Sequence, residues 1–422
     1  MADGREGAAA PKDGVRPYPG PRFSWRLVAL AAGPGLVAMF ADTDAGSVIT
    51  VAQSGAQWGY RLLAPNLLFI PFMFIAQELA LRLGLGTGQG ALELTRRRFG
   101  RIAAAALLAA LAASCFGALV SEMSGLAGVG QSLGASAGAT MALAVVGLMA
   151  MVITGSYRSV ERVALFLGLF EVAFLAMAWR AAPGFAPIVE EAARAPLNDP
   201  DYLYLLAANL GSSVIPWALL YQQSASVDKG LGARHLGGAR LETLVGVVFC
   251  QAITSALLIA AGATLANGGP IETVAEIETA FTATLGPTFG HVVFVFGLTG
   301  SALTAAIVVC LTLAWAVGET FDVGRSLEHS PAKAPWFYGA MAAMLAGAGA
   351  LVASGADLVK LSIAAGVVNA ALLPIVLAAL YFLARTALPE PLRLKGAYAA
   401  AVAAAFLAIG AVGLYSGVAG LL

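Results

Sequence analysis

The chain has 422 residues, of which 59% are hydrophobic and only 11% are charged, and its mean hydropathy is +0.83. Because soluble globular proteins carry about 25% charged residues, this composition argues against a soluble enzyme, a secreted disulfide scaffold, a disordered chain and a nucleic-acid-binding protein. The 24 basic and 24 acidic residues balance, so net charge indicates no partner, and we expect an all-α protein that crosses the membrane many times.

About 20 apolar residues are needed for a helix to cross a bilayer, and eleven segments meet this requirement. They lie near residues 26–54, 62–84, 102–130, 139–156, 163–181, 203–226, 242–266, 287–318, 337–354, 358–385 and 395–417. Residues 1–24 are polar and lack the apolar stretch of a signal peptide, which predicts a disordered cytoplasmic arm.

The basic residues predict the orientation of the chain in the inner (cytoplasmic) membrane. With the N-terminus in the cytoplasm, every Lys and Arg falls on the cytoplasmic side except Arg61, Arg180, Arg194 and Lys360. This distribution follows the positive-inside rule. Eleven spans would then place the C-terminus outside.

Two of the expected spans are interrupted near their centres. Residues 42–47 of the first span read Asp-Thr-Asp-Ala-Gly-Ser, and residues 212–217 of the sixth read Ser-Ser-Val-Ile-Pro-Trp. Spans five apart are equivalent in an inverted repeat of five helices, where the unwound backbone and the half-helix ends bind ions and substrates. The expected division is therefore a first repeat at 25–182, a second repeat with its outer connecting segment at 183–386, and an additional helix 11 at 387–422.

Asp44 is the candidate for binding a cation in the first interruption. It has no Lys or Arg at helical spacing within its own span, and an ionised carboxylate in the middle of a membrane costs several kcal/mol unless it is compensated. A bound cation is the economical partner; the alternative is that Asp44 is neutral or hydrogen-bonded and serves packing. Asp42 is expected near the ion path, or as a gate or capping carboxylate.

At these residues the sequence resembles the Nramp family of divalent-metal transporters, which share the LeuT-type fold. Asp44-Ala45-Gly46-Ser47 is similar to the family's span-1 motif Asp-Pro-Gly-Asn, and Ile215-Pro216-Trp217 is similar to its span-6 motif Met-Pro-His. Weaker matches follow in order, at Gly33-Pro34-Gly35, Gln57-Trp58-Gly59-Tyr60, Gln77, Arg82-Leu83-Gly84, Thr87-Gly88 and from Gly300 to Glu319. The resemblance implies a LeuT-type fold of eleven transmembrane helices with helices 1 and 6 unwound, and a metal site at Asp44, Ser47, Ser212 and Ile215.

The departures from the family motifs concern the choice of metal. Ile215 stands where the family has a methionine, whose soft thioether favours manganese and iron over magnesium and calcium, and Ser47 replaces an asparagine. A site made of carboxylate, hydroxyl, backbone carbonyl and water suits Mg²⁺ or Mn²⁺. Together with Tyr221-Gln222-Gln223-Ser224-Ala225 and Asp228-Lys229-Gly230, this pattern looks like the Nramp-related magnesium transporter branch.

The groups that couple Nramp transport to protons are also changed. Trp217 replaces one span-6 histidine, the second falls near Gln222, Leu119 takes the place of a span-3 aspartate, and residues 337–354 contain no arginine. A proton relay needs groups that titrate in the accessible pH range. We therefore expect uptake of Mg²⁺, and also Mn²⁺, by alternating access without proton coupling. The alternatives are a proton-coupled Mn²⁺ importer and an amino-acid transporter of the same fold.

The remaining polar residues of the spans are assigned to supporting roles. Those expected near the ion, as more distant ligands or along its path, are Asp42, Glu122, Trp217, Gln222, Gln223 and Asn369. Glu171 is expected in a buried structural ion pair, and Glu78 in a salt-bridge cluster near Arg82. The sequence contains no nucleophile–base pair or nucleotide loop, so we expect no enzyme and no cofactor. The expected partners are the metal substrate and the bilayer, with no nucleic acid and no obligatory protein partner.

Overall fold

The computed structural model describes residues 33–154, 166, 169–181, 184–266, 269–322 and 335–420, and within these ranges all regular secondary structure is helical. In chain order the elements are α2 (Pro34–Asp42), α3 (Ala45–Trp58), α4 (Leu63–Thr87), α5 (Ala91–Ser132), α6 (Ala137–Thr154), η1 (Leu169–Val172), α8 (Ala173–Ala181), α9 (Phe185–Ala192), α10 (Pro200–Ser213), α11 (Pro216–Asp228), η2 (Ala233–His235), α12 (Leu236–Thr264), α13 (Val274–Leu285), α14 (Pro287–Phe321), α15 (Pro335–Ala353), α16 (Leu358–Thr386), η3 (Glu390–Leu392) and α17 (Gly396–Ala419). The arm expected at 1–24 lies outside the described residues.

The helices confirm a multi-pass membrane protein. Seven helical stretches among the described residues are long and apolar enough to cross a membrane, or eight if the pair 170–181 and 185–192, bent by 106°, counts as one. Helices α6 and α15 are apolar but shorter, and the first expected span is divided between α2 and α3. The number of eleven crossings stays a prediction.

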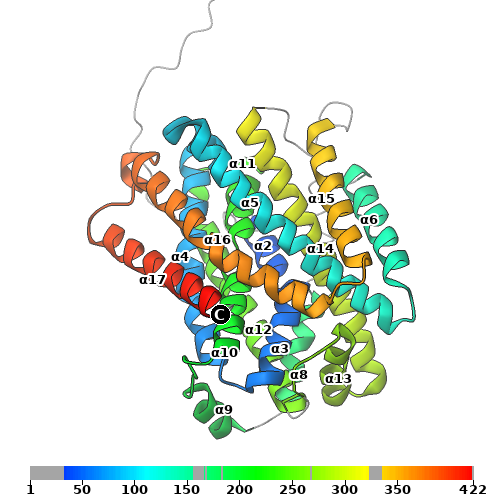
Figure 1. Ribbon diagram of the computed structural model, residues 1–422. Coiled ribbons are helices and arrows are strands. Elements are labelled where there is room, and N and C mark those ends of the chain that lie inside the picture. Colours follow the sequence, from blue (N-terminus) through cyan, green and yellow to red (C-terminus); the bar gives the residue numbers. More distant parts are fainter. Residues whose placement is uncertain are drawn as a thin grey trace, which may run out of the picture.

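Both expected interruptions are breaks between two helices. α2 ends at Asp42 and α3 begins at Ala45, whereas α10 ends at Ser213 and α11 begins at Pro216. A proline has no N–H to donate and disfavours helical backbone in the residue before it, which explains why the second break falls just before Pro216. Figure 1 shows α2 above α3, and α11 above α10, in the centre of the molecule.

Glycines allow the helices around these breaks to pack closely. A Cβ atom on Gly211 of α10 would overlap the carbonyl oxygen of Gly366 in α16, and a Cβ on Gly366 would lie only 2.8 Å from the carbonyl oxygen of Ala208. A Cβ on Gly125 of α5 would likewise overlap the Cβ of Ala45. Larger residues at these positions would push the helices apart.

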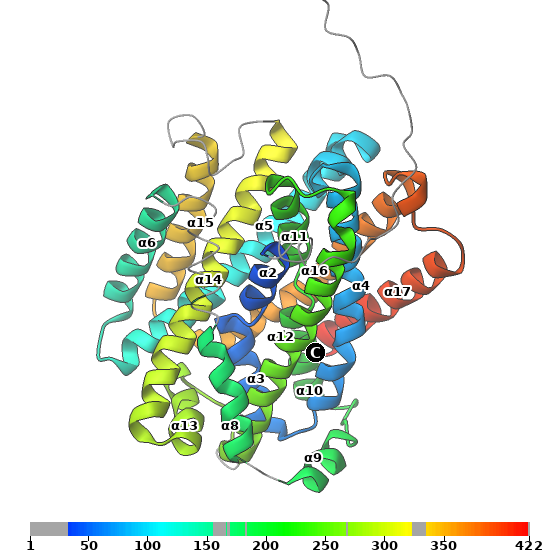
Figure 2. The same cartoon turned by 180° about the vertical axis from the view of Figure 1, so that it is seen from behind.

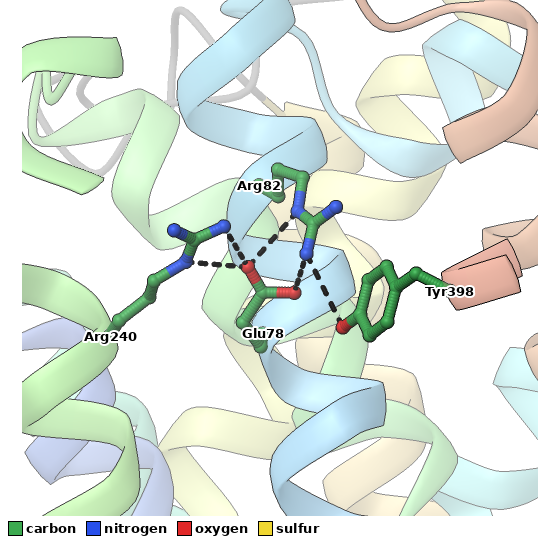
Figure 3. Close-up of polar contacts among 4 residues, drawn as sticks. All are labelled: Glu78, Arg82, Arg240 and Tyr398. Carbon is green, nitrogen blue, oxygen red and sulfur yellow. Dashed lines mark hydrogen bonds and ion pairs between the residues drawn. The ribbon is translucent and has the colours of Figure 1, made fainter. Parts of the chain in front are cut away.

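A charged cluster ties three helices together at one end of the bundle (Figure 3). The Nε of Arg82 donates to Oε1 of Glu78 at 3.0 Å, and the Nε of Arg240 donates to the same oxygen at 2.7 Å. The guanidinium of Arg82 also donates to the hydroxyl of Tyr398 at 3.5 Å. The cluster links α4, α12 and α17, and it confirms the salt bridges expected near Arg82.

Candidate functional site

The backbone bend of the first broken span is fixed by a helix cap. Asp44 is the N-cap of α3, and its Oδ1 accepts the backbone N–H of Ser47 at 2.6 Å. The side chain is buried, with 4% of the residue exposed. Gly46 permits the close approach of α5, because a Cβ there would lie 2.9 Å from the Cβ of Ser121. The carboxylate is therefore held at the break by the local geometry of its own helix.

The Ser47 hydroxyl joins the two breaks. It lies 2.9 Å from the carbonyl oxygen of Asp42, at the end of α2, and 3.1 Å from that of Ser212, near the end of α10, and can donate to either. The C-terminal ends of helices carry partial negative charge. Two such ends and the Asp44 carboxylate thus meet at one place, and this favours a cation there.

Two buried glutamates face the same region. Glu122 of α5 accepts the backbone N–H of Ala45 at 3.1 Å and interacts electrostatically with Asp44. Glu171 of η1 interacts with the side chain of Thr43 and with Asp44, and among the described residues no basic side chain pairs with its buried carboxylate. Within that part of the chain the expected ion pair of Glu171 is not found. Carboxyl groups that are buried close to one another, as Asp44, Glu122 and Glu171 are, need protons or cations to neutralise them.

Asp42 is held differently. Its Oδ2 accepts a hydrogen bond from Nε2 of Gln77 at 3.1 Å, while Oδ1 has no partner in the described ranges. The side chain therefore faces α4, and its backbone carbonyl faces Ser47. This arrangement fits a residue beside the break better than a second carboxylate ligand.

The donors at the break are oxygen atoms. No group of three or more His, Cys, Asp or Glu side chains in the described residues is arranged to hold a metal ion. An ion would therefore be bound by Asp44 together with backbone carbonyls, the Ser47 hydroxyl and water. Ile215 is the N-cap of α11, and its carbonyl accepts the N–H of Leu219 at 3.3 Å, which leaves one lone pair. These are ligands suited to hard cations.

The two glutamines expected near the ion or along its path contact other helices through their amide nitrogens. Nε2 of Gln222 donates to the hydroxyl of Thr243 at 2.7 Å, and Nε2 of Gln223 donates to the carbonyl oxygen of Gln89 at 3.0 Å. Both follow Pro216 by six or seven residues, which is about 10 Å along a helix. They join α11 to α12 and to the start of α5, while the Oε1 atom of each is buried without a partner among the described residues. Their place near the ion or along its path stays a prediction.

Asn369 and Trp217 are two further residues expected near the ion or along its path. Asn369 accepts the hydroxyl of Ser114 at 2.6 Å. The next residue, Ala370, packs closely against Gly211, which precedes Ser212, so a role of Asn369 near the ion stays a prediction. Trp217 lies in the first turn of α11, fully buried, and its indole N–H has no partner in the described part of the chain. It packs beside the break.

Glu319 is a structural residue that the sequence did not single out as a contact site. Its carboxylate accepts the backbone N–H of Leu92 at 3.1 Å and the hydroxyl of Ser224 at 2.8 Å. It therefore joins α14 to α5 and α11, close to the contact of Gln223. The sequence signals are an acidic residue near the end of a long apolar helix and its place at the end of the stretch from Gly300 that resembles the family.

Comparisons with known proteins find a family model and relatives along most of the chain. The family described as natural resistance-associated macrophage protein-like, Nramp, matches residues 35–419. The divalent metal cation transporter MntH of Verminephrobacter eiseniae is 27% identical over 301 residues, which are 66% of this chain and 65% of the relative. MntH of Xanthomonas campestris is 29% identical over 336 residues, which are 74% of this chain and 72% of the relative.

Solved structures show the fold. The manganese transporter of Eremococcus coleocola, in complex with an aromatic bis-isothiourea substituted compound, has a TM-score of 0.74 at 15% identity, over 93% of this chain and 87% of that one. MhsT in complex with L-phenylalanine has a TM-score of 0.58 at 14% identity, over 92% of this chain and 98% of that one. The expected LeuT-type fold is confirmed. Since the family match runs through both broken spans and nearly the whole described chain, this protein is no enzyme but a member of the Nramp family.

Proposed function

We propose that the protein transports divalent metal cations across the membrane by alternating access, with Asp44 as the principal ligand. One observation carries the proposal: the Ser47 hydroxyl contacts carbonyl oxygens of both broken spans directly beside the buried Asp44 carboxylate. Half-helix ends that meet near the bilayer centre are the sites where transporters of this architecture bind ions. The names of the MntH relatives support the same substrate class.

The oxygen donors support Mn²⁺ and Mg²⁺ as substrates. The relatives and the Eremococcus coleocola structure are named for divalent metals and manganese, which favours Mn²⁺. The Ile215 side chain has no sulfur or oxygen to offer, and this supports Mg²⁺, which prefers oxygen ligands and retains several waters. Membership of a magnesium-transporting branch is accordingly part of the proposal.

Proton-coupled Mn²⁺ import is the second candidate function. It is favoured by the MntH relatives and by the two glutamates near Asp44, since Glu122 and Glu171 are buried ionisable groups beside the break. Glu122 and Glu171 thus provide titratable groups beside the break, although the span-6 histidines of the family are replaced in this chain. Uncoupled uptake, driven by about 4.6 kcal/mol for a divalent cation at 100 mV, remains the other form of the proposal.

One experiment tests substrate and coupling together. Purified protein in liposomes is assayed for uptake of Mn²⁺, Mg²⁺, Ca²⁺ and Cd²⁺ in competition, with internal pH recorded in parallel. We expect Mn²⁺ and Mg²⁺ to compete for one site that Asp44→Asn abolishes. Metal-dependent acidification would establish the proton-coupled form, and its absence the uncoupled one. Full uptake by Asp44→Asn, or amino-acid uptake that is indifferent to metals, would contradict the proposal.

A further inference from the structure

A polar cavity of about 480 Å³ lies at the end of the bundle that carries α9, the end predicted to face outward. Trp58, Tyr60 and Arg61, from the connection between α3 and α4, form one side of it, and Glu191 of α9 forms another. Trp58 is the last residue of α3, whereas Asp44 caps the other end, so the cavity is about 20 Å from the metal site. Figure 2 shows α8 and α9 at this lower end of the molecule.

Two residues that line the cavity carry buried hydrogen-bond donors without acceptors in the described part of the chain. The indole Nε1 of Trp58 and the Nε of Arg61 are buried and have no partner among the described residues. The guanidinium of Arg61 lies over the Trp58 ring, 5.7 Å from its centroid, and the Tyr202 hydroxyl donates to the Arg61 carbonyl oxygen at 3.1 Å. The Arg61 guanidinium is therefore held against the Trp58 ring at the wall of the cavity, where it supplies a positive charge and donors for an anionic group.

A carboxylate faces the same cavity. Oε2 of Glu191 accepts the backbone N–H of Tyr60 at 3.1 Å, and in the described ranges the residue forms no ion pair with a basic side chain. Its position is fixed by this hydrogen bond and by close contact with Gly59, where a Cβ would overlap the carboxylate. The lining of the cavity thus contains both a carboxylate, Glu191, and a guanidinium, Arg61.

An apolar groove of about 740 Å³ continues the cavity along the same helices. Ala178 of α8, Ile188 of α9 and Ile259 of α12 line the groove, while Ala181, Glu191 and Gly262 line the cavity. Each pair is three residues apart on one helix, so the two spaces adjoin on the same helix faces. Trp179 and Phe185 beside the groove are 85% and 83% exposed, as expected for side chains that face lipid.

We propose that the cavity and the groove together form a binding site for a phospholipid with an ethanolamine headgroup. The phosphate accepts hydrogen bonds from Arg61 and Trp58, the ammonium group donates to Glu191, and an acyl chain lies in the groove between α8 and α12. A choline headgroup has no N–H to donate to Glu191, and a glycerol headgroup has no positive charge. The site is therefore selective for the primary amine.

The test measures which lipids the full-length protein retains. Protein purified from an equimolar mixture of phosphatidylethanolamine, phosphatidylcholine and phosphatidylglycerol with identical acyl chains is analysed by native mass spectrometry. The variants are Arg61→Gln, Glu191→Gln and, in the groove, Ala178→Trp. The matched control is Arg194→Gln, which removes an exposed arginine paired with Glu190 at 2.6 Å close to the same helix.

We expect preferential retention of phosphatidylethanolamine by the unmodified protein and by Arg194→Gln. Arg61→Gln lowers this retention about tenfold or more, as expected for loss of a charge-assisted hydrogen bond, and Glu191→Gln makes ethanolamine and choline lipids equal. Ala178→Trp weakens retention of the lipid but leaves binding of soluble glycerophosphoethanolamine unchanged.

Three results would overturn the proposal: equal retention of the three lipids by the unmodified protein, identical behaviour of Glu191→Gln and the control, or soluble headgroup binding as tight as that of the lipid. If Arg61→Gln does not fold, Trp58→Phe removes the indole donor alone and is expected to lower retention in the same direction. Unchanged retention by Trp58→Phe would then count against the site.

Discussion

Two substitutions of Asp44 separate metal binding from helix capping. In the unmodified protein the Ser47 N–H lies 2.6 Å from Oδ1 of Asp44. Because asparagine and aspartate cap helices about equally well, Asp44→Asn keeps an oxygen that accepts this N–H but removes the charge. Asp44→Ala removes both the charge and the cap. We therefore expect both variants to lose metal binding and only the alanine variant to lose stability.

The magnitudes follow from the burial and the hydrogen bond of Asp44. Removing one member of a buried charge pair costs about 3 to 5 kcal/mol, and since about 1.4 kcal/mol is a factor of ten, Kd for the metal rises about 150-fold or more. Loss of the cap costs about 1 kcal/mol. That energy shifts the melting temperature by about 2–4 °C in domains of 150–250 residues, and by less in this chain of 422.

Asp357 provides the matched control. It is the N-cap of α16, with Oδ1 accepting the Lys360 N–H at 3.0 Å, but it lies at the surface. Asp357→Ala should therefore cost the same cap energy without changing metal affinity. Titration calorimetry with Mn²⁺ and Mg²⁺ and thermal unfolding of the purified variants check both quantities. Metal binding by Asp44→Asn within tenfold of the unmodified protein would refute the reasoning.

Three further predictions concern other residues. Ile215→Met adds a thioether beside the break and should improve Mn²⁺ or Cd²⁺ uptake relative to Mg²⁺ in liposomes; unchanged selectivity would contradict the assigned ligand position. Glu319→Ala leaves two buried donors unpaired, at about 1–3 kcal/mol each, so its melting temperature should fall below that of Glu319→Gln. Partial burial acts to raise the pKa of Asp357, but the hydrogen bonds and charge of Lys360 outweigh it and hold that pKa below its ordinary value. The resulting stability is present above about pH 4 and is lost as pH falls through the lower folded-state pKa; melting curves at decreasing pH should show this loss and Asp357→Asn should lack it.

The parts of the fold and of the site that sequence predicts are those with a local cause. Long apolar segments predict membrane helices, Pro216 predicts the second break, and the lone carboxylate of Asp44 in an apolar span predicts a site in the first. Ser47 and Ser212, which the resemblance assigns to one metal site, lie in hydrogen-bond contact. Each of these statements depends on residues within one span or on the spacing of equivalent spans.

The partners of the other polar side chains could not be predicted in this way. Gln222 and Gln223 follow the second break by only six and seven residues. This is nearly two turns of α11, and their side chains contact Thr243 and Gln89. Asn369 faces Ser114 across α5 and α16. Such contacts depend on the axial register between two packed helices, and a single sequence does not specify that register directly.

Helix α17 bears on the energetics of the transport cycle. It packs against α10 and α16 so closely that a Cβ atom on Gly413 would lie 3.0 Å from the carbonyl oxygen of Ala370. Arg82 of α4 donates a hydrogen bond to Tyr398 of α17. In the expected division it follows both five-helix repeats and has no counterpart in the first. Two perfectly equivalent repeats would give inward-open and outward-open states of equal free energy. In that division α17 contacts α10 and α16 of the second repeat and, through Tyr398, α4 of the first. We therefore expect this helix, which has no symmetry-related counterpart, to make the two states of the proposed transport cycle unequal in free energy.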